Sequence, residues 1–218
     1  MHRLVWDQAG QKIYETGVKD CALYTMGEGG TYNKGVAWNG ITGITESPSG
    51  AEKTKLYAND AVYANLLSAE EYGATIEAYT YPEEFAECDG SAEIATGVTI
   101  GQQPRKSFGL AYKTTIGNDT ESTEHGYKLH LVYGGTASPS EKSHATINES
   151  PEAMSLSWEV STVPVAVTGH KPTASLEIDS TKVSAEALAK IEAKLYGDES
   201  GEPTLLLPDE IVALLAEG

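Results

Sequence analysis

The sequence predicts a mainly β protein, an antiparallel β-sandwich or barrel of about ten strands, from three observations. Several windows alternate apolar and polar residues with a period of two, which is typical of strands that bury one face. The 218 residues include 22 glycines and 9 prolines, which indicates many turns. Strands do not alternate with helices along the chain, so a parallel α/β fold is disfavoured.

Four windows show the alternation most clearly, and each is predicted to be a strand. They cover residues 107–113, 127–133, 154–160 and 174–179. Less regular runs predict further strands at 12–24, 35–45, 54–58, 62–67 and 74–81. Asn59-Asp60 has the length and residue types of a tight hairpin turn between two of these runs. Glycine, serine, proline and asparagine predict loops at 27–33, 47–53, 117–126 and 134–142.

Helix signals occur at two places outside the predicted strands. Pro82 suits a first helical position, and the acidic residues that follow it suit the positive end of the helix dipole, so a short flanking α-helix is expected up to about Cys88. Ser184 is an N-cap for a second helix that ends at Gly197, and its apolar face is formed by Leu188, Ile191 and Leu195.

The C-terminal region is predicted to be helical and separate from the strands. One more amphipathic turn or two is expected from Pro208 to Ala216. The last predicted strand ends before Lys182, which divides the chain into a β domain at 1–182 and a C-terminal helical extension at 183–218.

Negative charge is concentrated in one segment of the chain. The formal net charge is −17, and the 49 residues between Lys55 and Arg105 contain nine carboxylates and no lysine, arginine or histidine. Ordered apolar and aromatic residues in the same segment predict a folded surface and not a solvated tail. Such a surface repels nucleic acid backbones and acidic membranes. The nine carboxylates are Asp60, Glu70, Glu71, Glu77, Glu83, Glu84, Glu87, Asp89 and Glu93.

The N-terminal sequence and the hydropathy predict a cytosolic chain with no membrane insertion. The first residues lack the apolar core of a signal peptide, and no stretch approaches the roughly 18 apolar residues of a membrane helix. Cys21 and Cys88 are therefore expected to be reduced, buried thiols.

Motifs for catalysis or cofactor binding are not found in the sequence. It contains neither a phosphate-binding Gly-Lys-Ser/Thr loop nor a Gly-x-Ser-x-Gly elbow. The acidic residues from Glu83 to Asp89 do not follow the spacing of a calcium loop, and we expect them to form a solvated helix face. His130 falls on the polar side of its strand and is expected at the surface. No catalytic residue, cofactor or metal is predicted, which leaves a structural or binding protein.

Five stretches in order resemble a known family. They are GVAWNGIT at 35–42, ESPSGAE at 46–52, LYAN at 56–59, GATIEAYTYPEEF at 73–85 with CDG at 88–90, and SWEVST at 157–162. Together they resemble the major tail tube proteins of long, non-contractile tailed bacteriophages. The similarity runs from about Leu4 to Lys182, and its specificity comes from the number of stretches, since none is a catalytic signature.

The resemblance implies a β-sandwich with a flanking helix that forms hexameric rings. Stacked rings make the hollow tube of the virion tail, assembled in the host cytoplasm, through which DNA is ejected without specific binding. Other tail proteins, such as the tape measure and the terminator, would be partners. Six copies carry a formal charge of 6 × (−17) = −102, so ring closure has to rest on apolar burial and on pairing of edge strands.

Two sets of residues are candidates for this function. The lumen-facing hypothesis names Asp60 and Glu77 first and then Glu70 and Glu71. The hypothesis for contacts between subunits or rings names the loop residues Ser47, Pro48, Ser49, Gly50, Asn118 and Asp119. The alternative function is an acidic β-sandwich binding protein, either a DNA mimic or a carbohydrate-binding module, and an enzyme is disfavoured.

Overall fold

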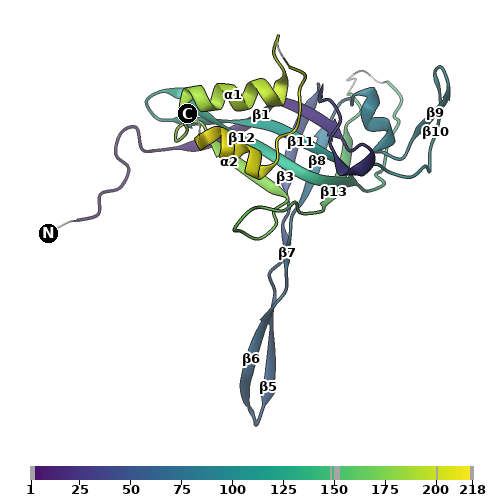
Figure 1. Cartoon of the computed structure of the whole chain (residues 1–218). Helices are drawn as coiled ribbons and strands as arrows, with labels where there is room; N and C mark the ends of the chain where they lie inside the picture. Colours follow the sequence, from purple (N-terminus) through teal and green to yellow (C-terminus); the bar gives the residue numbers. More distant parts are fainter. Residues whose placement is uncertain (1–2, 148, 150–152, 200, 217–218) are drawn as a thin grey trace.

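The fold is a curled antiparallel β-sheet with slender projections, shown in the computed structural model of Figure 1. The structure describes residues 3–147, 149, 153–199 and 201–216. Within these residues the main sheet has eight strands in the order β2-β1-β11-β12-β13-β8-β3, with β14 pairing to β12. The elements are β1 (Tyr14–Thr25), η1 (Glu28–Gly30), β2 (Val36–Ala37), β3 (Ile41–Glu46), β4 (Ser49–Gly50), β5 (Lys53–Ala58), β6 (Ala61–Leu67), β7 (Glu70–Glu71), β8 (Gly73–Ala78), η2 (Glu83–Glu87), β9 (Ala92–Ala95), β10 (Val98–Ile100), β11 (Phe108–Asn118), β12 (Ser122–Ala137), β13 (Leu156–Thr162), β14 (Ser175–Asp179), α1 (Ala185–Tyr196) and α2 (Pro208–Ala216).

Strand β12 belongs to two parts of the sheet because it bends near Gly134. One edge pairs with β11, whereas the other pairs with β14 through residues 128–132 and with β13 through residues 135–137. Gly134 has a φ of +58°, and a Cβ atom there would lie 2.4 Å from the carbonyl oxygen of Val163. Only glycine fits this position without strain. The bend lets β13, β8 and β3 fold over the sheet until β3 approaches β1, which agrees with the predicted mainly β, sandwich class.

Aromatic side chains fill the space inside the curled sheet. Trp158, Phe85 and Phe108 are fully buried, and Trp38 is nearly so. The ring centroids of Trp38 and Phe85 lie 4.4 Å apart, and those of Phe85 and Phe108 lie 5.4 Å apart. Each such pair adds roughly 0.5–1.5 kcal/mol beyond simple burial. Phe85 is supplied by η2, so this short helix closes the inner core.

Helices α1 and α2 cover the outer face of the same sheet. The Ser184 hydroxyl accepts a hydrogen bond from the Ala187 amide at 3.3 Å, which confirms the predicted N-cap. The predicted face of α1, Leu188, Ile191 and Leu195, is buried together with sheet residues on β12 and with Leu205, Leu206 and Ile211. The Tyr133 hydroxyl donates to the Leu206 carbonyl at 2.9 Å, which ties the segment before α2 to the sheet.

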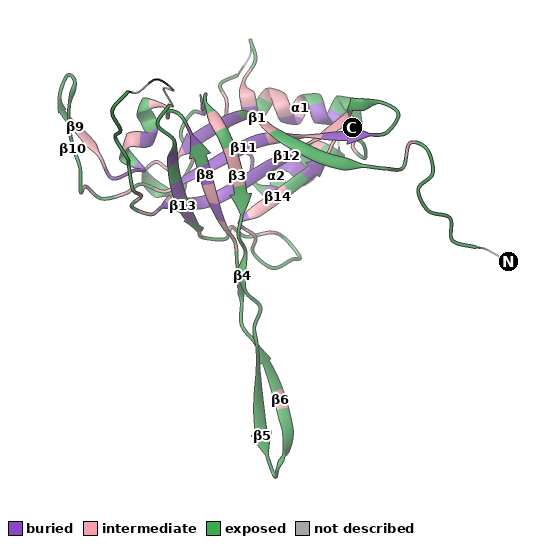
Figure 2. Ribbon diagram, turned by 180° about the vertical axis from the view of Figure 1, so that it is seen from behind, coloured by how far each residue is buried: buried purple, intermediate pink, exposed green. Residues whose placement is uncertain are grey.

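The hairpin of β5 and β6 projects from the body and is exposed along almost its whole length (Figure 2). Asn59 and Asp60 form its tip, with φ values of +50° and +60°. Two central residues with positive φ are the mark of a type I′ turn, and asparagine and aspartate tolerate that conformation better than most residues. The tight turn predicted at these residues is confirmed.

Two expected loops are shorter in the structure, because β11 continues to Asn118 and β12 runs from Ser122 to Ala137. The glycines that predicted the first loop are inside strands. A Cβ atom at Gly117 would lie 2.4 Å from the Tyr14 ring, and one at Gly126 would lie 2.7 Å from the Thr181 side chain. These glycines therefore mark close packing and not turns.

The acidic segment around Pro82 also differs from its prediction. The flanking helix is present at Glu83–Glu87, but it is a 3-10 helix. Asp89 is buried and not solvated: its carboxylate accepts from the Trp158 indole at 3.0 Å and lies 2.5 Å from the Lys142 ammonium and 3.5 Å from the Arg105 guanidinium. These donors offset the cost of burying the charge.

In the part of the chain that the structure describes, no helix is both long enough and apolar enough to cross a membrane.

We expect Phe85→Ala to destabilise the protein by about 3–5 kcal/mol, because it removes the ring at the centre of the inner aromatic cluster. Urea unfolding followed by tryptophan fluorescence measures the loss. The matched control is Ile94→Ala, since Ile94 is 64% exposed and its truncation should change the free energy of unfolding by less than about 0.5 kcal/mol. Equal losses in the two variants would contradict this account of the core.

Candidate assembly surfaces

The β5–β6 hairpin is an exposed apolar surface on a strongly acidic chain. Tyr57 is 67% exposed and Tyr63 is 78% exposed, and Leu56, Val62, Leu66 and Leu67 are exposed as well. An isolated two-stranded hairpin is marginally stable in water, and exposed apolar patches mark interaction sites. Residues 53–67 carry Lys53, Lys55 and Asp60, a net charge of 2 − 1 = +1 within a chain of −17.

The base of this hairpin is a short paired segment. Ser49 and Gly50 form β4 and pair with Glu71 and Glu70 of β7. A Cβ atom at Gly50 would lie 2.1 Å from the Ala69 carbonyl oxygen, so glycine allows the two strands to approach. The predicted contact residues Ser47–Gly50 therefore belong to the root of the projecting hairpin and are exposed.

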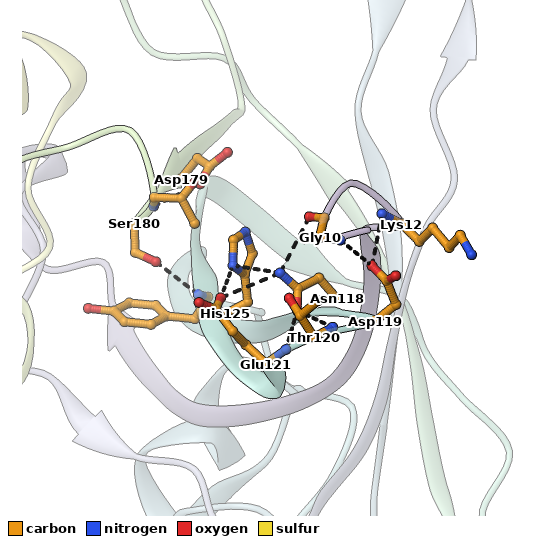
Figure 3. Close-up of polar contacts among 11 residues, drawn as sticks. Gly10, Lys12, Asn118, Asp119, Thr120, Glu121, His125, Asp179 and Ser180 are labelled. Atoms are coloured by element: carbon orange, nitrogen blue, oxygen red, sulfur yellow. Dashed lines mark hydrogen bonds and ion pairs between the residues drawn. The ribbon is translucent and has the colours of Figure 1, made fainter. Parts of the chain in front are cut away.

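The N-terminal segment is a second projection with exposed apolar residues, which are Leu4, Val5 and Trp6. It leaves the body where the β11–β12 turn holds it. The Asp119 carboxylate accepts hydrogen bonds from the backbone amides of Gly10 at 3.0 Å and Lys12 at 3.3 Å (Figure 3). Asp119 thus anchors this segment within its own chain.

Asn118 shapes the turn that carries Asp119. Its side chain is buried, and its carbonyl oxygen accepts from the backbone amides of Thr120 at 3.0 Å and Glu121 at 2.5 Å. The Glu121 carboxylate lies 2.5 Å from the His125 ring, which closes the network in Figure 3. The two predicted contact residues Asn118 and Asp119 are therefore bonded within the chain, and whether they also reach a neighbouring subunit stays a hypothesis.

A shorter hairpin, β9–β10, projects from the other end of the body (Figures 1 and 2). Its exposed apolar residues are Ile94, Val98 and Ile100. This hairpin is not among the strands predicted from the sequence. A short alternation of apolar and polar residues on each side of Thr96-Gly97 could have indicated it.

The candidate lumen residues do not form one cluster. Asp60 is at the tip of the long hairpin, Glu70 and Glu71 are on β7 at its base, and Glu77 is on β8 in the main sheet. All four are exposed, and in the described residues none has a lysine, arginine or histidine partner within 4 Å. Of the other carboxylates in the acidic segment, Glu87 pairs with Lys106 at 2.5 Å.

The two cysteines are poor nucleophiles. Burial raises the pKa of Cys21 and of Cys88 to about 12, so both remain thiols at neutral pH. Among the described residues, no group of three or more histidine, cysteine, aspartate or glutamate side chains could hold a metal ion.

Comparisons with known proteins give only weak structural similarity. No family model and no curated protein matches the sequence. A chain in the cryo-EM structure of the anti-feeding prophage baseplate, determined with 6-fold symmetry, overlaps with a TM-score of 0.38 and 7% sequence identity. The overlap covers 83% of this chain and 100% of that chain. A similarity at this level establishes neither a shared family nor a shared function.

Proposed function

We propose that this chain is a structural subunit of a bacteriophage tail tube, which forms hexameric rings that stack into a hollow conduit for DNA. The observation that carries the proposal is the long β5–β6 hairpin, whose tyrosines and leucines are exposed on a folded acidic body. The motif resemblance to tail tube proteins supports the same conclusion. A second copy of the chain is the simplest partner, because it presents an acidic surface to a hairpin of charge +1.

Assembly has to overcome repulsion between copies. At physiological salt the Debye length is about 8 Å, so exposed charges repel mainly at close approach. Burying the hairpin tyrosines in a neighbouring subunit stabilises the contact by roughly 25 cal/mol per Å² of apolar area. The N-terminal segment and the β9–β10 hairpin offer further apolar contacts at opposite ends of the body, an arrangement that suits head-to-tail rings.

Negative-stain electron microscopy of the concentrated protein tests assembly, and we expect rings and tubes. The double variant Tyr57→Ser/Tyr63→Ser should remain folded, with an unchanged circular dichroism spectrum. Its critical concentration for tube formation should rise by at least about tenfold, because two large contact side chains are lost.

The control for this experiment is Val212→Ser, which changes an exposed apolar residue on α2 and should assemble normally. Normal tubes from the double variant would contradict the role of the hairpin. Monodisperse monomers of the parent protein that bind a basic protein or a glycan would favour the alternative binding function instead.

The proposal includes an acidic wall that does not retain DNA, with Glu77 as its first candidate on the sheet. Each lysine–phosphate contact steepens the salt dependence of DNA binding by nearly one unit of log–log slope. Tubes assembled from Glu77→Lys should therefore retain duplex DNA at low salt and release it as salt is raised, whereas Glu124→Lys, at an exposed position near the start of β12, should not. Co-sedimentation of labelled DNA with tubes measures retention. If parent and Glu77→Lys tubes retain equal amounts, Glu77 does not face the lumen.

A further inference from the structure

His130 lies at the roots of two projecting parts of the chain. It is only 8% exposed, which corrects the surface position expected from the sequence. Its ring stacks on Tyr112, the residue opposite it on β11, with centroids 4.7 Å apart and planes 5° from parallel. The side chains of Tyr112, Glu15 and Glu46 surround the ring, which strand alternation alone does not reveal.

Two carboxylates from different strands approach the two ring nitrogens of His130. The Glu15 Oε1 atom lies 3.5 Å from Nε2, and the Glu46 Oε1 atom lies 3.8 Å from Nδ1. Glu15 is on β1, directly after the N-terminal segment 3–13. Glu46 is the last residue of β3, directly before the segment 47–72 that contains the long hairpin.

Hydrogen bonds determine which nitrogen of the neutral ring carries the proton. The single hydroxyl hydrogen of Thr114 is donated to Glu15 at 2.6 Å. The Thr114 oxygen, 2.9 Å from Nε2, can then only accept, so His130 donates from Nε2. The unprotonated nitrogen is therefore Nδ1, which lies 3.8 Å from the Glu46 carboxylate. Protonation of Nδ1 turns this repulsive contact into an attractive one.

Other charged groups lie around His130. Lys128 on β12 lies 2.8 Å from Glu15 and 3.1 Å from Glu177 on β14. One lysine and three carboxylates, with Glu46 as the third, sum to 1 − 3 = −2 when His130 is neutral. They sum to −1 when it is protonated.

The surroundings of Glu15, Tyr72 and Tyr112 shift the pKa of each group. Partial burial opposes ionisation of Glu15, but hydrogen bonds from Lys128 and Thr114 and nearby positive charge outweigh it, so the pKa of Glu15 lies below its usual value. Burial, assisted by the charge of Glu46, raises the pKa of Tyr72. Burial and the neighbouring Tyr72 and Glu46 raise the pKa of Tyr112, whose neutral hydroxyl donates to Glu46 at 3.0 Å.

Space for the carboxylate of Glu46 to move is present beside the ring. A hollow of about 110 Å³ is lined by Glu46, Tyr72, His130 and Glu177 together with aliphatic side chains. The 3.8 Å separation is longer than a hydrogen bond, so a small shift of Glu46 would complete one. Two hydrogen bonds hold the ends of segment 47–72, which form the root of the long hairpin. The Ser47 amide donates to the Gly73 carbonyl at 2.8 Å, and the Thr162 hydroxyl donates to the Tyr72 carbonyl at 2.6 Å.

We propose that His130 is a pH-sensitive clamp: protonation of its Nδ1 forms a charged hydrogen bond to Glu46 and fixes the root of the long hairpin against β12. Glu15, bonded on the opposite side through Thr114, links the start of β1 to the same ring. Histidine is the side chain that changes charge between pH 5 and 8, so acidification tightens the hairpin root and neutral pH loosens it.

Hydrogen exchange in the monomer at low concentration tests the clamp. The protection factor of the Ser47 amide should be about fivefold higher at pH 5.5 than at pH 8, while that of Leu188 in α1 should not change. His130→Gln, which can still donate to Thr114 but cannot be charged, should abolish the pH dependence at Ser47. Glu46→Gln should abolish it as well, and His170→Gln, at an exposed position, should leave it intact.

Two outcomes would overturn the clamp: equal protection of Ser47 at both pH values in the parent protein, or a pH dependence that survives in both His130→Gln and Glu46→Gln. If His130→Gln fails to fold, Glu46→Gln gives the same answer. Any effect on tube yield rests on the proposed function. Should tubes not form at all, that function fails, while exchange in the monomer still decides whether the clamp exists.

Discussion

The bend of β12 at Gly134 is the constraint on which the rest of the structure depends. By pairing first with β14 and then with β13, one strand joins the outer part of the sheet to the strands that fold over it. The inner aromatic core and the outer helical core are therefore built on opposite faces of the same strands. Because the 2.4 Å separation from the Val163 carbonyl leaves no room for a side chain, this architecture depends on one glycine.

Large apolar side chains are buried in the body of the protein but exposed in its projections. In the body, large apolar side chains are buried and ionic groups such as Asp89 find several donors. In the β5–β6 hairpin, tyrosines and leucines face water, and only a turn and a ladder of backbone hydrogen bonds hold the two strands together. A two-stranded ribbon of this kind gains stability when another surface covers it. The proposed self-association would bury these exposed side chains and place the hairpin, of charge +1, against an acidic surface.

Local signals predicted much of the fold. The period-two windows, the Asn59-Asp60 turn and the Ser184 cap correspond to elements of the structure, because each depends on neighbouring residues in the chain. The prediction failed where a residue on a polar face is covered from a distance. Alternation places His130 and Lys113 on polar faces but cannot show that Tyr112, Glu15 and Glu46 surround the first, or that Glu192 and Tyr196 of α1 contact the second. The candidate assembly surfaces were missed for a similar reason. The acidic residues can be recognised in the sequence, but the projection of apolar segments from the body cannot.

The central claim is that the long hairpin is an assembly element that a neighbouring copy covers. A cryo-EM map of the assembled particle at side-chain resolution tests it most directly. The account predicts density for residues 53–67 seated on another subunit, with Tyr57 and Tyr63 buried in the contact and the acidic body around a central channel. A map in which subunits associate while this hairpin extends into solvent would contradict it.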